Sequence, residues 1–269
     1  MEVYAFFNEK GGVGKTTSAL AMLSYFYSPD FFKEGEGKKA LAIDMDPQRS
    51  MTLLSGAKPE PGHMILDVLA DETAIRDAVT VTAFGDIIAT NRELKTIDAQ
   101  MDVDSAETVA QRKEFEENLL VLRKKVRELE GLYDYVILDC PPGYANIAMA
   151  CMVAADALIL PAKASKASLY ALSSVSPMVA KARQYNPDLQ IAGVLLTHHN
   201  DRTNAAKYGA EASGALAEAN LNAKVFKATI RYSTAIEDSF FDGVPLFERS
   251  TPVTNDYRNF IEELLKGEQ

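Results

Sequence analysis

Short runs of consecutive apolar residues recur along this chain, and segments with a helical spacing of apolar positions separate them. The run from Val3 to Phe7 is β-branched and aromatic, which predicts a strand. From Thr16 to Tyr27 the apolar residues lie three or four positions apart, which predicts a helix. The sequence therefore starts with a strand that is followed by a helix.

The same alternation continues to the end of the chain. Further strands are predicted over residues 38–44, 86–90, 133–139, 157–160, 191–197 and 225–230, and further helices over 65–69, 74–79, 105–130, 144–155, 167–185, 204–219 and 253–266. Continuous apolar strands between helices are typical of a parallel sheet covered on both faces. We predict a doubly wound, mostly parallel α/β sheet. No linker, repeat or change of composition divides residues 1–269, so we predict a single domain.

The composition is that of an ordinary globular protein, with 47% apolar and 25% charged residues. The net charge is −10, so contact with nucleic acid would need a local basic patch. Cys140 and Cys151 lack the spacing of a disulfide framework or a CxxC metal site, which fits a reducing compartment. We find no signal peptide, and no apolar run approaches the ~20 residues of a membrane helix. We therefore expect a cytoplasmic protein.

A glycine-rich segment lies between the first strand and the first helix. Residues 8–17 read NEKGGVGKTT and end in the Gly-Lys-Thr of a phosphate-binding loop. In such loops backbone N–H groups point at the phosphates, the lysine contacts the β- and γ-phosphate oxygens, and the next hydroxyl binds Mg²⁺. The sequence therefore predicts nucleotide binding, with Lys15 and Thr16 in these two roles.

Two positions depart from the ordinary phosphate-binding loop. The usual pattern has glycine at position 9, where this chain has Glu9, and it needs no cation at position 10, where this chain has Lys10. A glycine-rich turn that only caps a core helix would explain the glycines. It would not explain two lysines five residues apart.

One predicted strand ends in Asp139, which precedes Cys-Pro-Pro-Gly. An acid at this place can hold Mg²⁺, usually through a water, opposite the Thr16 hydroxyl. An aspartate that merely ends a strand at a Pro-Pro turn is the alternative.

A second predicted strand ends in Asp44 and continues to Asp46. Side-chain alternation directs both carboxylates to the same side, at the end of the strand where the phosphates should lie. Hydrolysis needs a residue that orients water and a cation that neutralises developing charge. Both acids are therefore candidates for the site, although they could also cap the next turn.

Three of these segments together resemble the motifs of a known family. Lys10–Thr17, Asp44–Gln48 and Asp139–Pro142 look like the deviant Walker A, Walker A′ and Walker B motifs of the ParA/Soj/MinD family of P-loop ATPases. The Asp-Pro-Gln and Asp-Cys-Pro-Pro sequences look more like the ParA/Soj branch, and a weaker likeness covers nearly the whole chain. The resemblance implies one P-loop ATPase domain that hydrolyses ATP with Mg²⁺.

The resemblance also implies a role for each motif residue. Lys10 would cross an ATP-bound dimer interface to the phosphates of the partner subunit, much as an arginine finger does. Asp46 would position the attacking water, Asp44 would support the metal and its water shell, and Asp139 would hold the metal through a water. The base should lie near the end of the strand that closes at Thr197. The nucleotide-binding set is then Lys10, Gly11, Gly12, Val13, Gly14, Lys15, Thr16 and Thr17.

The ParA/Soj branch further implies a homodimer that binds nonspecific DNA on the nucleoid when it holds ATP, and a ParB-like protein that stimulates hydrolysis. Between His198 and Arg231 the chain has five basic residues against three acidic ones, which reverses its overall sign. Scattered solvated lysines would give the same count. The predicted DNA contacts are Arg202, Lys207, Lys224, Lys227 and Arg231. The family commonly has Pro-Arg after this strand, where this chain has Arg231-Tyr232.

The main prediction is an ATPase that partitions a plasmid, a chromosome region or a similar cargo. The same switch could instead position a protein cargo. A MinD-like, membrane-cycling ATPase would need a basic amphipathic helix near the carboxyl end, but residues 259–269 are short and acidic. An iron–sulfur carrier would need closely spaced cysteines, and a metabolic kinase or amide ligase would leave Lys10 unexplained.

Overall fold

The computed structural model describes residues 1–28, 38–143, 145–165, 172, 174–199, 205–218, 221 and 223–267. Within these residues the strands form one eight-stranded sheet in the order β3-β4-β2-β5-β1-β6-β7-β8. Neighbouring strands are parallel except for β3 and β4, which are antiparallel. The strands are β1 (Glu2–Phe6), β2 (Ala40–Asp44), β3 (Val79–Thr82), β4 (Gly85–Ile88), β5 (Tyr135–Asp139), β6 (Ala157–Lys163), β7 (Gln190–His199) and β8 (Val225–Arg231).

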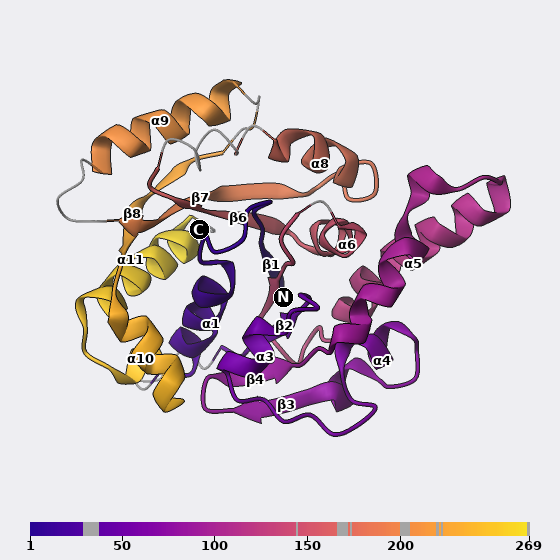
Figure 1. Ribbon diagram of the computed structural model, residues 1–269, viewed down its shortest axis with the longest axis horizontal. Helices are drawn as coiled ribbons and strands as arrows, with labels where there is room; N and C mark the ends of the chain where they lie inside the picture. The colour runs from indigo at the N-terminus through magenta and orange to yellow at the C-terminus, as the bar shows by residue number, and fades with distance from the viewer. Residues whose placement is uncertain are drawn as a thin grey trace.

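Helices cover both faces of this sheet (Figure 1). The α-helices are α1 (Lys15–Phe26), α3 (Ser50–Leu54), α4 (Ile65–Leu69), α5 (Val109–Arg127), α6 (Asn146–Ala154), α8 (Val175–Ala182), α9 (Ala205–Glu218), α10 (Thr234–Asp242) and α11 (Pro252–Lys266). The 3₁₀ helices are η1 (Ile75–Ala78), η2 (Arg92–Met101), η3 (Val103–Ser105) and η4 (Leu246–Glu248). In the described part of the chain, no helix combines the length and the apolar character that crossing a membrane requires.

The strand β1 shows how a continuous apolar run supports two cores. Val3, Ala5 and Phe7 pack in the core under α5, α6 and α8, whereas Tyr4 and Phe6 pack in the core under α1 and α11. Successive side chains of a strand point to opposite faces, so a strand buried on both faces must be apolar at every position. The predicted fold class, a doubly wound and mostly parallel α/β sheet, is confirmed.

Some elements differ from the sequence prediction. The sequence predicts neither β3, a short antiparallel edge strand, nor α3 and α10. The helix predicted over 105–130 is shorter, because Thr108 caps its start by accepting a hydrogen bond from the Gln111 N–H at 3.1 Å. The helix predicted over 167–185 corresponds in part to α8. Residues 167–171 and 173 of that prediction lie outside the described residues.

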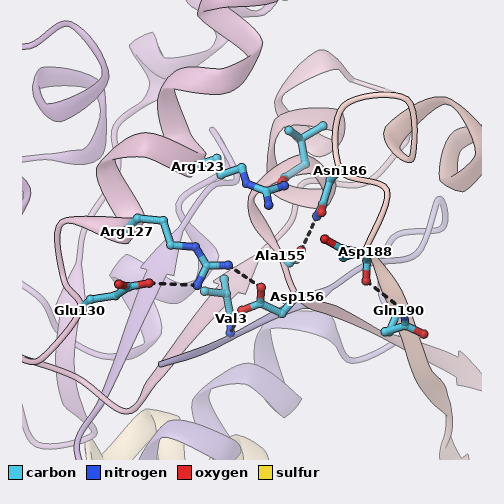
Figure 2. Close-up of polar contacts among 10 residues, drawn as sticks. Val3, Arg123, Arg127, Glu130, Ala155, Asp156, Asn186, Asp188 and Gln190 are labelled. Atoms are coloured by element: carbon cyan, nitrogen blue, oxygen red, sulfur yellow. Dashed lines mark hydrogen bonds and ion pairs between the residues drawn. The ribbon is translucent and has the colours of Figure 1, made fainter.

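A polar cluster at the amino ends of the strands holds several segments together (Figure 2). The Asp156 carboxylate accepts a hydrogen bond from the Val3 N–H at 2.8 Å and forms an ion pair with Arg127 of α5. Asn186, which precedes β7, donates to the Ala155 carbonyl at 2.7 Å. This network ties β1, β6 and α5 together at the end of the sheet opposite to the glycine-rich loop.

Candidate nucleotide and metal site

The glycine-rich loop joins the carboxyl end of β1 to the amino end of α1. Gly12 and Gly14 have φ values of 68° and 94°, in the left-handed region that side chains other than glycine rarely adopt. Gly14 is the N-cap of α1, and no side chain caps this helix end. The first N–H groups of α1 are therefore available to an anion, as in other phosphate sites at helix N-termini.

Lys15 lies inside this loop and is only 7% exposed. Its ammonium donates hydrogen bonds to the carbonyl oxygens of Asn8 at 3.1 Å and Lys10 at 3.0 Å. Burial lowers the pKa of Lys15, and the carboxylates of Asp139 and Asp46 act in the opposite direction. The structure therefore places this cation between the loop and the acidic residues.

Asp139 lies at the end of β5, in register with Asp44 of β2 and with Phe6 of β1. It is fully buried, and neither carboxylate oxygen makes a hydrogen bond of good geometry among the described residues, although the Thr16 hydroxyl lies near the carboxylate. Burial raises the pKa of Asp139 well above its usual value and Asp44 raises it further, while Thr16 and Lys15 oppose the shift. A buried carboxylate without partners is unfavourable unless a cation or water reaches it.

The residues around Asp139 fit Mg²⁺. The described part of the chain contains no cluster of three or more His, Cys, Asp or Glu side chains that could enclose a metal. Mg²⁺ does not need such a cluster, because it usually keeps several waters and is held by one or two carboxylates together with phosphate oxygens. The unpartnered Asp139 carboxylate and the Thr16 hydroxyl suit that mode of binding.

Asp44 is also fully buried, but its oxygens have protein partners. One oxygen accepts hydrogen bonds from the Thr52 N–H at 2.8 Å and the Thr52 hydroxyl at 2.7 Å, and the other accepts one from the Asp46 N–H at 3.1 Å. Burial raises the pKa of Asp44 to about 6, although the hydrogen bonds from Thr52 lower it. These contacts fix the carboxylate beside Asp139 and tie the end of β2 to α3.

Asp46 is 9% exposed, and one of its oxygens accepts a hydrogen bond from the Gln48 N–H at 2.9 Å. Burial raises the pKa of Asp46, and the positive charge of Lys15 lowers it. Asp44 and Asp46 thus form the local turns that the alternative interpretation predicts. The Asp46 carboxylate also lies close enough to Lys15 for the two charges to interact.

Lys10 differs from Lys15 because its side chain is exposed at the surface. Its N–H donates to the Asn8 side-chain oxygen at 2.9 Å, and the Asn8 amide in turn donates to the Pro161 carbonyl of β6 at 2.7 Å. Asn8 is buried. The backbone of Lys10 is therefore anchored to the sheet, while the side chain lies outside the buried site.

A pocket of about 240 Å³ lies next to Gly14 and Thr17. Its walls come from the ends of β7 and β8 and from α10 and α11, and the lining includes Thr197, Arg231, Tyr232, Ile236, Phe240 and Tyr257. The pocket borders Thr197, the residue near which the resemblance places the base. The sequence does not reveal the other lining residues, because α10 is not predicted and the segments are distant in sequence. The sequence does contain a signal for α10: Ser233, a typical N-cap residue, precedes Ile236 and Phe240, which have a helical spacing.

The residues predicted to contact DNA have different surroundings. Lys224 and Lys227 are exposed at the edge strand β8, and the Lys224 ammonium lies 4.9 Å from the centre of the Phe226 ring. The Arg231 guanidinium donates two hydrogen bonds to the Asp256 carboxylate, at 2.7 and 2.9 Å, and Arg231 lines the pocket. The Lys207 side chain and all of Arg202 lie outside the described residues. DNA contact therefore stays a prediction at these positions.

The fold and the loop define a P-loop nucleotide-binding protein. Residues 1–191 match a family described as an AAA domain. The chain is 29% identical over 210 residues to the sporulation initiation inhibitor protein Soj of Bacillus subtilis, covering 76% of this chain and 75% of Soj. It is 26% identical over 275 residues to the chromosome partitioning protein ParA of Caulobacter vibrioides, covering 100% and 96%.

The structure of apo McdA from Cyanothece superposes with a TM-score of 0.77 at 23% identity, covering 98% of this chain and 99% of McdA. This likeness concerns the fold. The family match over residues 1–191 and the sequence relatives place the chain in a family. The chain belongs to the ParA/Soj/MinD family of P-loop ATPases.

Proposed function

We propose that the protein is a Mg²⁺-dependent ATP hydrolase that dimerises when it binds ATP. The dimer binds DNA without sequence preference and, with a ParB-like partner, segregates a plasmid, a chromosome region or a similar cargo. One observation carries this proposal. Lys15 is buried beside Asp139 and Asp46, whereas Lys10 is exposed five residues earlier. An exposed cation at this loop can act on the γ-phosphate that is bound to a second subunit.

Nucleotide binding uses the loop and the neighbouring pocket. The phosphates lie against residues 11–17 at the amino end of α1, and Lys15 exchanges its two carbonyl acceptors for phosphate oxygens. The base occupies the pocket beside Gly14 and Thr17, where Tyr232 and Ile236 offer aromatic and apolar surface.

Thr16 and, through a water, Asp139 would hold Mg²⁺, and Asp44 would support its shell. At this place a bound Mg²⁺ would supply positive charge against the phosphates. Asp46 orients the attacking water, because its carboxylate lies at the same strand ends and is held there by the turn to Gln48. Lys10 from the second subunit and Lys15 from the first both face the transferred phosphate. The catalytic set is therefore Lys10, Lys15, Asp44 and Asp46.

DNA binding would use local charge, because the net charge of the chain is −10. Lys224 and Lys227 supply exposed cations at β8. The proposed cellular location is the cytoplasm, with the ATP-bound dimer on the nucleoid.

Positioning of a protein cargo by the same ATPase switch remains the first alternative function. A MinD-like membrane cycle is the second alternative. The packing of α11 makes this helix unsuitable as a membrane anchor. Tyr257, Phe260, Ile261 and Leu264 of α11 are buried in the core under α1. A helix whose apolar side already fills a core has no such side to place in a membrane interface.

Sedimentation with nonspecific DNA, with and without ATP and at two salt concentrations, tests the proposal. We expect co-sedimentation that requires ATP and weakens as salt rises, because binding to DNA phosphates releases counterions. Binding to anionic vesicles in place of DNA would favour the membrane cycle. Binding to neither would contradict the DNA-dependent function.

A further inference from the structure

Glu9 stands where an ordinary phosphate-binding loop has glycine, and the site described above assigns it no role. Its carboxylate accepts a hydrogen bond from the Ser174 hydroxyl at 2.7 Å. Its backbone carbonyl accepts one from the Gly143 N–H at 2.8 Å. One residue of the loop thus contacts two segments that lie more than a hundred residues away in sequence.

Both partners of Glu9 belong to segments next to the site. Gly143 follows Asp139 by four residues and has a φ of 83°, so it forms the turn after the carboxylate that suits Mg²⁺. Ser174 holds the N-cap position of α8, yet its hydroxyl makes no capping hydrogen bond and donates to Glu9 instead. Serine at this position commonly caps its own helix. Here the hydroxyl joins α8 to the loop.

The contacts of Lys15 indicate at which step the hydrogen bonds of Glu9 to Gly143 and Ser174 become important. The Lys15 ammonium is bound to the carbonyls of Asn8 and Lys10, the residues on either side of Glu9. When Lys15 moves to the phosphates, both carbonyls lose that ammonium. The bonds of Glu9 to Gly143 and Ser174 do not involve Lys15, so they can persist through this change.

We propose that Glu9 is a positioning residue of the nucleotide cycle, which holds the backbone of Lys10 in place when Lys15 leaves its carbonyl acceptors for the phosphates. This inference rests on the proposed function, because the position of Lys10 matters if its side chain reaches a second subunit. Loss of the Glu9–Ser174 contact should therefore impair the nucleotide-driven dimer more than nucleotide binding itself.

The test compares Glu9→Ala, Ser174→Ala and the double variant by sedimentation velocity with Mg²⁺ and the non-hydrolysable analogue AMPPNP. Each single variant should weaken dimerisation about tenfold, the order expected for one hydrogen bond to a charged group, with analogue affinity changed less than about threefold. The double variant should be no worse than the more impaired single variant, because both substitutions remove the Glu9–Ser174 hydrogen bond. Glu9→Gln keeps an acceptor for Ser174 and should recover most of the dimer.

Glu72→Ala, which removes an exposed glutamate outside the site, is the matched control and should behave as wild type. Wild-type dimerisation of Glu9→Ala, strictly additive losses in the double variant, or a Glu9→Gln as defective as Glu9→Ala would each overturn the inference. If Glu9→Ala does not fold, Ser174→Ala and Glu9→Gln decide the matter with the same readouts. A wild-type protein that stays monomeric with AMPPNP would refute the proposed function itself, so the two failures are distinguishable.

Discussion

Lys10 and Lys15 have the same chemistry but different surroundings. Lys15 is 7% exposed and bound to two carbonyls of its own loop, whereas the Lys10 side chain is exposed and its backbone is tied to Asn8. A buried ammonium group can contact only groups within its own site, whereas an exposed one can also contact a second molecule. The two lysines should therefore fail in different ways when they are removed.

Lys10→Ala should bind ATP with nearly wild-type affinity but lose ATP-dependent dimerisation. Turnover should fall by about a thousandfold or more, the lower end of the range for loss of a cation that acts in trans on a transferred phosphate. Lys15→Ala is the comparison, and it should lose nucleotide binding. Equilibrium binding of a fluorescent ATP analogue and sedimentation velocity measure the two properties. Normal ATP-dependent sedimentation of Lys10→Ala would refute the role in trans.

Asp46→Ala should separate assembly from chemistry. The carboxylate is placed by the hydrogen bond that it accepts from the Gln48 N–H. We expect the variant to bind ATP and dimerise, and to hydrolyse at least about a hundredfold more slowly, as for loss of a group that assists proton transfer or water orientation. Phosphate release under single-turnover conditions checks this, with nucleotide affinity as the control. Wild-type turnover would remove Asp46 from the catalytic set.

At the scale of elements, the sequence predicts a site residue within a short continuous motif better than a pocket built from several distant segments. Lys15, Asp44 and Asp139 are predictable, because each lies at the end of a strongly apolar strand or in a glycine-rich loop whose two lysines a plain helix-capping turn does not explain. The ladder then brings Asp44 and Asp139 into register. The pocket beside Thr17 is not predictable, because the ends of β7 and β8 and two later helices build it. Such tertiary proximity leaves no local pattern.

The same limit explains the short elements. The β3 strand has a Val-Thr-Val-Thr alternation, but it is four residues long and lies at the sheet edge, where packing on β4 decides its conformation. The α11 helix is the opposite case. Its apolar residues repeat along one side for fifteen residues, and that side is buried as the pattern predicts.

The helix α11 also connects the two walls of the pocket. Asp256 holds the Arg231 guanidinium and N–H of β8, and the next residue, Tyr257, lies with its hydroxyl 3.2 Å from the Ser18 hydroxyl of α1. Asp256 is 9% exposed and Tyr257 1%. Two consecutive residues of one helix thus brace β8 and α1 on either side of the space proposed for the base.

Asp256→Asn should weaken this brace. The bidentate contact with Arg231 loses its charge, and we expect unfolding free energy to fall by about 2 kcal/mol, the order for a hydrogen-bonded pair of charged groups. The apparent nucleotide affinity should fall with it, because Arg231 lines the pocket. Glu262→Gln, which removes an exposed pair with Lys266 on the same helix, should change stability by less than about 0.5 kcal/mol. Urea denaturation and nucleotide titration measure both. Equal effects of the two substitutions would contradict the bracing role.

At the scale of the whole molecule, the charge is divided unevenly. The chain carries a net charge of −10, so its overall field repels DNA. The phosphate-binding loop and the acids gather at the carboxyl ends of the central strands, whereas Lys227 lies on the edge strand β8 and Lys224 directly precedes it. In Figure 1, β8 and α11 lie at the outer side of the sheet, beyond α1. A DNA surface there would be separate from the nucleotide site but joined to it through Arg231 and α11.

Replacing Lys224 and Lys227 together by alanine tests whether this edge contacts DNA. If each lysine neutralises one phosphate, the slope of log affinity against log salt should become shallower by about 0.9 for each lost contact, and nonspecific binding should weaken at low salt. ATP affinity and dimerisation should be unchanged, because neither side chain lines the pocket or the loop. Lys113→Ala removes an exposed lysine from α5 and serves as the control, since a change in net charge alone would affect both variants. DNA titrations by fluorescence anisotropy at several salt concentrations, with ATP present, give the slopes. An unchanged slope in the double variant would place the DNA contacts elsewhere on the dimer, and an equal change with Lys113→Ala would show that only the overall charge matters.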